Sequence, residues 1–152
     1  MKQVLLMLAS LVLTTVVSTA TYNNTLNGSQ TAAPEAEGIA LNMTASGDLP
    51  GMSKVTLHRN GQNVTGGNFR IIVLPQNADA SSHERGHLIG TISGGTLALT
   101  AEGTLASASD VQVTVQSGTG EFASVTSGTA TLTITTNAEN PTQLNGALVL
   151  NF

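Results

Sequence analysis

Residues 110–136 read DVQVTVQSGTGEFASVTSGTATLTITT, and this stretch decides the fold. Two runs of alternating apolar and polar residues flank a glycine-rich connection. Alternation places successive side chains on opposite faces of an extended chain, so each run predicts a strand with one buried face. We expect these buried faces to be formed by Val111, Val113, Val115, Ala130, Leu132 and Ile134.

The same alternation recurs from residue 39 to the end of the sequence. It predicts further strands at residues 39–44, 54–58, 69–74, 87–93, 96–104 and 145–152. Turns are expected at residues 47–51, at Asn60-Gly61 and at Gly94-Gly95, because glycine and asparagine tolerate positive φ. The count predicts an all-β fold, an eight-stranded antiparallel meander over residues 39–152. A closed barrel is favoured over a sandwich, because closure removes unpaired edges.

The first residues have the pattern of a targeting segment. Lys2 precedes an apolar run at residues 4–17, and Ser18-Thr19-Ala20 supplies small residues at a cleavage site. We expect residues 1–20 to be a signal peptide and the protein to be secreted or periplasmic. A membrane anchor is the alternative, but a spanning helix needs about 20 apolar residues, and the apolar run at residues 4–17 is shorter than that. Residues 21–38 are polar and lack periodicity, which predicts a flexible N-terminal arm.

Composition narrows the classes of function. The chain has five basic and nine acidic residues and no cysteine. The basic residues do not cluster in the sequence, which argues against nucleic acid and anionic membrane surfaces as partners. Because the chain has no cysteine, the exported fold must be stable without disulfides. The sequence indicates no cofactor, and it leaves the oligomeric state open.

Two segments resemble a group of exported bacterial β-barrel proteins. Residues 118–129, GTGEFASVTSGT, resemble the signature GTGRFAGATGSGT, and residues 45–51 resemble an early turn of the same group. Glu121 stands where the signature usually has arginine, and Ser124 where it has glycine. The group is similar in fold to the allene oxide cyclase and dirigent barrels. The resemblance implies an eight-stranded barrel and transfers no catalytic residue.

Residues 83–87, HERGH, match the zinc-peptidase pattern HExxH. That chemistry needs a helix, in which the two imidazoles lie about 6 Å apart on one face. In a strand His83 and His87 would lie roughly 13 Å apart. Gly86 disfavours a helix, and the preceding residues offer no apolar face to bury one. We therefore expect His83, Glu84 and His87 to lie in a solvated loop and to hold no metal.

The leading functional hypothesis is an exported, non-catalytic barrel that holds a small apolar ligand in its lumen. The candidate lumen residues are Val111, Val113, Val115, Ala130, Leu132, Ile134, Leu148 and Leu150. A structural or surface-interaction β-domain is the alternative, followed by a cyclase-like enzyme and, last, an HExxH peptidase. The C-terminal Phe152 is also typical of outer-membrane barrels. These need strands of about 9 to 11 residues and aromatic girdles, whereas the expected strands are shorter and aromatic residues are 3% of the chain.

Overall fold

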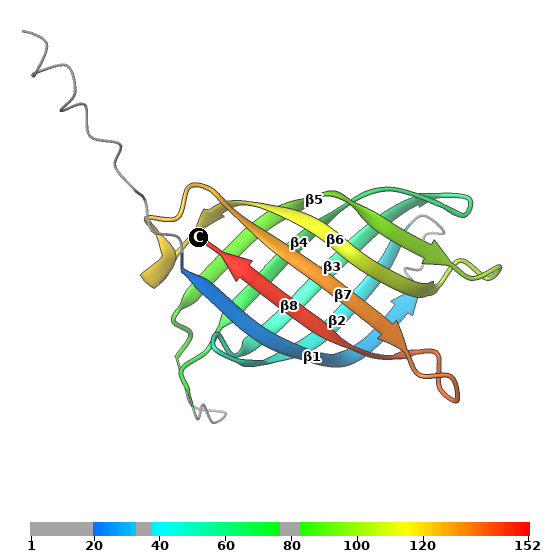
Figure 1. The fold of residues 1–152 in the computed structure, drawn as a ribbon, viewed down its shortest axis with the longest axis horizontal. Coiled ribbons are helices and arrows are strands. Elements are labelled where there is room, and N and C mark those ends of the chain that lie inside the picture. Colours follow the sequence, from blue (N-terminus) through cyan, green and yellow to red (C-terminus); the bar gives the residue numbers. More distant parts are fainter. Residues whose placement is uncertain (1–19, 33–37, 77–82) are drawn as a thin grey trace, which may run out of the picture.

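Eight antiparallel strands form one closed barrel in the computed structural model, which describes residues 20–32, 38–76 and 83–152. Each strand pairs with its neighbours in sequence, and the first strand pairs with the last (Figure 1). The predicted all-β meander and its closure are therefore confirmed. The strands are β1 (Thr21–Ala32), β2 (Gly38–Gly47), β3 (Gly51–Asn60), β4 (Asn63–Val73), β5 (Gly86–Leu99), β6 (Leu105–Gly118), β7 (Gly128–Thr136) and β8 (Gln143–Asn151), with one 3-10 helix, η1 (Gly120–Phe122), between β6 and β7.

The prediction of a flexible arm at residues 21–38 is wrong, because β1 fills most of that range. β1 pairs with β2 on one side and with β8 on the other, so both edges of the strand are hydrogen-bonded. Leu26, for example, lies opposite Ala45 of β2 and Gly146 of β8. Ladder hydrogen bonds on both sides order a strand whose side chains are mostly polar. The predicted signal peptide, up to residue 19, and residues 33–37 lie outside the described residues.

The predicted hairpin at Gly94-Gly95 is also wrong, because β5 runs through both glycines. The pairing of β5 with β6 shifts register on each side of Gly94, which marks a bulge in a continuous strand. A Cβ atom at Gly95 would lie 2.4 Å from the Cα of Val111, and its φ of 114° suits glycine alone. The predicted number of strands is nevertheless correct. The two strands expected on either side of Gly94-Gly95 are one strand, β5, and β1 is a strand that was not predicted.

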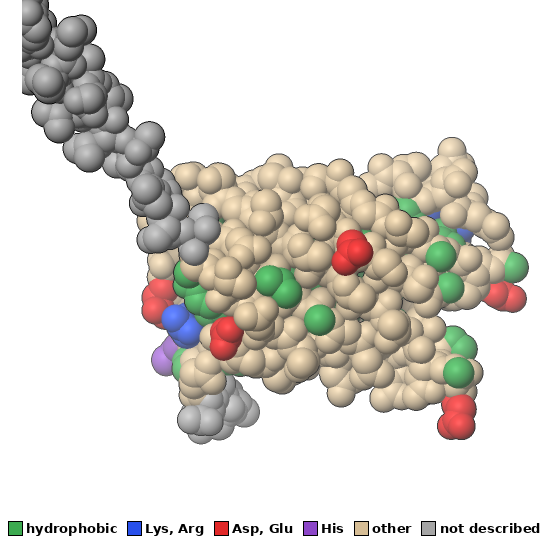
Figure 2. Space-filling model, in the orientation of Figure 1, with side chains coloured by type: hydrophobic (Ala, Val, Ile, Leu, Met, Phe, Trp, Pro, Cys, Tyr) green, Lys and Arg blue, Asp and Glu red, His purple; other side chains and the backbone are tan. Residues whose placement is uncertain are grey.

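The lumen holds the hydrophobic core. All eight residues predicted to face inward are buried, with at most 2% of their surface exposed. Phe69 is the largest fully buried side chain in the described part of the chain. Outward positions carry mainly threonine, asparagine and glutamine, and Figure 2 shows only scattered hydrophobic side chains on the barrel wall.

Strand length does not separate this barrel from outer-membrane barrels, because its strands have 9 to 14 residues. The expectation of shorter strands is therefore wrong. The distribution of side chains does distinguish the two, since outer-membrane barrels carry an apolar outer band and a polar interior. Here the interior is mainly apolar, with Asn24, Gln30 and Ser53 as buried polar residues, and the exposed large hydrophobic residues are Met52 and Ile89 in the described ranges. No helix in the described part of the chain is long and apolar enough to cross a membrane.

Candidate functional site

Side chains fill the lumen where the predicted ligand residues meet. The void left between them is about 10 Å³, which is about the space of one water molecule. Its lining includes Val111, Leu132 and Ile134 from the predicted set. An apolar ligand could enter only if these side chains moved. Binding of a ligand in the lumen therefore stays a prediction.

One buried polar side chain of β1 joins β1 to a strand that is not its neighbour in the barrel. The Gln30 Nε2 donates hydrogen bonds to the carbonyl oxygens of Leu105 and Pro141, each at 2.9 Å. The backbone N–H of Leu105 donates to Gln30 Oε1 at 2.7 Å. Gln30 is 4% exposed, and its two bonds with Leu105 are buried, whereas the bond to Pro141 is partly buried. They join β1 to the start of β6 and to the loop between β7 and β8.

The HExxH residues do not form a helix. Residues 83–85 are irregular, and β5 begins at Gly86, so His83 and His87 do not share a helical face. The Nε2 atom of His87 lies 2.6 Å from a carboxylate oxygen of Glu84. The described residues contain no group of three or more histidine, aspartate or glutamate side chains placed to hold a metal ion. The geometry that the peptidase chemistry needs is therefore missing here, and the lack of a zinc site stays a prediction.

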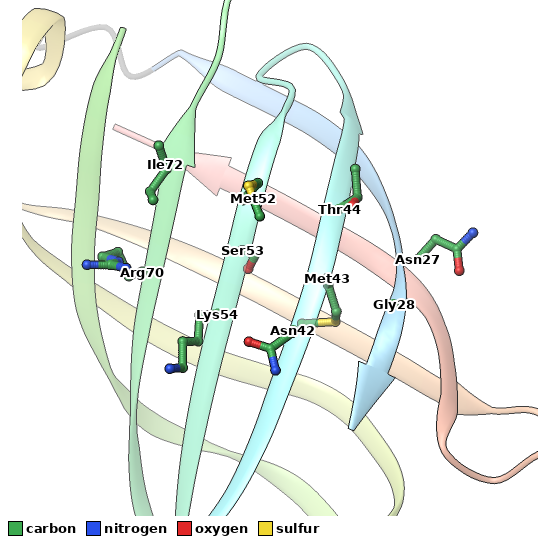
Figure 3. Close-up of a pocket in the computed structure, with 10 residues that line it drawn as sticks. All are labelled: Asn27, Gly28, Asn42, Met43, Thr44, Met52, Ser53, Lys54, Arg70 and Ile72. Atoms are coloured by element: carbon green, nitrogen blue, oxygen red, sulfur yellow. The ribbon is translucent and has the colours of Figure 1, made fainter. Parts of the chain in front are cut away.

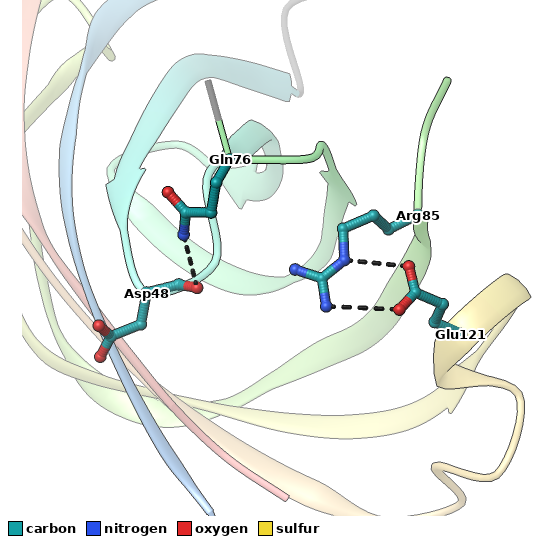
Figure 4. Close-up of polar contacts among 4 residues, drawn as sticks. All are labelled: Asp48, Gln76, Arg85 and Glu121. Atoms are coloured by element: carbon teal, nitrogen blue, oxygen red, sulfur yellow. Dashed lines mark hydrogen bonds and ion pairs between the residues drawn. The ribbon is translucent and has the colours of Figure 1, made fainter. Parts of the chain in front are cut away.

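The segment with the family-like signature closes one end of the barrel. Phe122 of η1 is 6% exposed and packs edge-on against Phe152, which stacks on Tyr22 with ring centroids 4.8 Å apart. Arg85 forms an ion pair with Glu121 at 3.0 Å, and Gln76 donates to the backbone of Asp48 nearby (Figure 4).

This end of the barrel also has a shallow hollow of about 470 Å³. Its charged side chains, Arg85 and Glu121, neutralise each other, and Arg85 also lies 5.8 Å from the centre of the Phe122 ring. Its aromatic rings pack on one another. The charged and aromatic side chains of this hollow therefore contact one another and hold η1 on the barrel, and the rest of its lining includes Ser124, Thr126 and Ser127.

A second groove, of about 280 Å³, crosses the outer face of β1 to β4. We call it the outer groove. The strand register explains its shape, because outward side chains of paired strands form rows that run across the sheet. One row, the apolar row, contains Thr44, Met52 and Ile72, which are direct cross-strand partners. Figure 3 shows this row above the inward-facing position of Ser53, whose backbone forms part of the floor.

The other wall of the outer groove is the basic row. Asn42 lies opposite Lys54, and Lys54 lies opposite Arg70. All three side chains are exposed, and they form the lower row in Figure 3. Asn27 of β1 adds a second amide at the end of the groove. The outer groove therefore places two cations and the Asn42 amide opposite a short apolar wall, with the Asn27 amide at its β1 end.

A β-bulge makes Lys54 and Arg70 direct partners. Beside the turn, Asn60 pairs with Asn63, but after the bulge His58 pairs with Gly66. The extra residue shifts the register by one position, and every later outward residue of β4 meets a different partner on β3. Two like charges thus lie directly opposite each other, an arrangement that costs stability in a sheet.

No acidic group neutralises this pair within the described ranges. The ion pairs found there join Arg85 to Glu121 and His87 to Glu84. The chain as a whole is acidic, with a net charge of −4. This local excess of positive charge on an acidic protein attracts anions to the outer groove.

Comparison with protein-family models, with curated proteins and with solved structures gave no match to this chain. The relationship to the barrels similar to allene oxide cyclase therefore stays a prediction, and the barrel itself is what the structure establishes.

Proposed function

We propose that this protein is an exported, non-catalytic barrel that acts as a binding module through its outer surface. The observation that carries the proposal is the contrast between the lumen and the outer groove, since the charged side chains of the hollow beside η1 are paired with each other. The lumen void is about 10 Å³, whereas the outer groove measures about 280 Å³ and is lined by exposed polar and charged side chains. Small-molecule sites have volumes of about 300 Å³ or more, so the outer groove is close to that range.

The polar outer wall supports a barrel that works in water. Export is supported by the sequence of residues 1–20, which has the pattern of a signal peptide. The absence of a helix at residues 83–87 removes the structural context for the catalytic motif that the sequence suggested. Together these observations favour the surface-interaction alternative over a lumen ligand and over an enzyme.

Titration with an apolar fluorescent dye distinguishes the outer surface from the lumen. We expect the folded protein to show no saturable dye binding, because the lumen void is only about 10 Å³ and Ala130 is fully buried. Saturable binding to the folded protein that disappears in Ala130→Phe, with the fold retained by circular dichroism, would refute the proposal. That result would establish the lumen as the ligand site.

A further inference from the structure

We infer that the outer groove binds an acidic oligosaccharide, a glycan that carries carboxylate groups on its sugar rings. The inference rests on the proposed function, since it names the ligand class for the outer surface.

The basic row selects an anion. Lys54 and Arg70 are adjacent, exposed and without a carboxylate partner in the part of the chain that the structure describes. An arginine guanidinium presents paired donors that match a carboxylate, and a lysine ammonium adds a point charge. An anion bound between them would offset the repulsion of this like-charge pair. The bulge that places them opposite each other thus creates a site that fits a carboxylate.

The rest of the groove selects a sugar rather than an alkyl chain. The apolar row contributes only two substantial apolar side chains, Met52 and Ile72, of which Met52 is 61% exposed. Such a short wall covers one face of a sugar ring but leaves most of an alkyl chain in water. The amides of Asn27 and Asn42 and the hydroxyl of Thr44 have both donors and acceptors, which suit sugar hydroxyl groups.

The dimensions and the charge favour a short, moderately charged polymer. The groove crosses four strands, and neighbouring strands lie about 4.8 Å apart, so it is roughly 14 Å long from β1 to β4. It lies on the outer wall, so a chain can extend beyond either end. A densely charged polyanion such as nucleic acid would meet only two cations on a chain with a net charge of −4.

Isothermal titration calorimetry with tetragalacturonate tests this inference, with galactotetraose as the neutral probe. We expect saturable binding of tetragalacturonate and at least roughly tenfold weaker binding of galactotetraose, because a hydrogen bond to a charged group is worth about that factor. Lys54→Gln and Arg70→Gln should each weaken binding of tetragalacturonate by roughly tenfold. Met52→Ser should weaken it by roughly fivefold, through the loss of apolar contact.

Gln112→Glu is the matched control. It lowers the net charge by one, as Lys54→Gln does, at an exposed position on β6 outside the groove. We expect it to change the affinity by less than about twofold, since exposed charges at a distance are screened. Equal weakening by Gln112→Glu and Lys54→Gln would mean that overall charge, rather than the outer groove, attracts the ligand, and would overturn the inference.

Lys54→Glu separates loss of binding from loss of folding. The substitution replaces a like-charge pair by an opposite-charge pair with Arg70, so the urea midpoint should rise while binding of tetragalacturonate disappears. Equal binding of both sugars, or no binding of either, overturns the acidic-oligosaccharide inference. In that case the dye titration still decides the proposed function, because it reports on the lumen alone.

Discussion

Replacing Gln30 by leucine should lower the free energy of unfolding by about 3 kcal/mol. The substitution keeps the approximate size of the side chain but removes three hydrogen bonds with the backbone of Leu105 and Pro141. The buried N–H of Leu105 loses its partner at a cost of about 1–3 kcal/mol, and each carbonyl adds about 1 kcal/mol. Burial of the leucine side chain returns roughly 1–2 kcal/mol.

Urea denaturation followed by far-ultraviolet circular dichroism measures this change. With a slope of about 1.5 kcal/mol/M, the midpoint should fall by about 2 M, and the melting temperature by roughly 10 °C. Gln116→Leu is the matched control, because Gln116 is exposed on the outer face of β6. We expect it to change stability by less than about 1 kcal/mol.

Equal stability of the two variants would refute the argument. It would mean that Gln30 makes no buried contact with β6, and that residues 21–32 behave as the flexible arm that the sequence suggested. Destabilisation of Gln30→Leu alone would establish that β1 is part of the cooperative fold.

Val113→Asp should destabilise the barrel by at least about 3 kcal/mol, because it places an unpaired charge among buried residues, whereas Gln112→Asp should stay within roughly 1 kcal/mol. Similar urea midpoints for the two variants would mean that the inward face of β6 is assigned wrongly. Elemental analysis of protein purified without an affinity tag should find no stoichiometric zinc; zinc that is lost in His83→Ala would contradict this. N-terminal sequencing of exported protein should begin at Thr21, and retention of Lys2 would disprove the predicted cleavage.

The aliphatic strands could be predicted because their burial is visible in the sequence. An apolar residue recurs at every second position over residues 111–115 of β6 and 130–134 of β7, so the face that enters the lumen could be assigned before the structure. β1 has no such pattern, since its alternate inward positions include Asn24, Gly28 and Gln30. Its place depends on two partner strands and on hydrogen bonds across the lumen, and neither has a local signal.

The outer groove could not be predicted because it depends on register. A hairpin that continued the pairing of Asn60 with Asn63 would place Lys54 opposite Phe69 rather than Arg70. The pair forms only because the bulge next to the turn adds one residue to β4. The sequence does show one basic residue within each of the two strands that the Asn60-Gly61 turn joins. That pattern predicts that the two strands are neighbours, but it does not predict which residues lie directly opposite each other.

The pairing of β1 with β8 also has a consequence for how the protein is made. Ribosomes synthesise β1 before the other strands and β8 after them, so β1 has only one of its two neighbours until β8 has been made. Contacts between residues so far apart in sequence form slowly. Closure of the barrel therefore follows the synthesis of all eight strands. Until it occurs, the free edges of β1 and of the growing sheet are able to pair with another incomplete chain, so the fold is open to exchange of β1 between two copies.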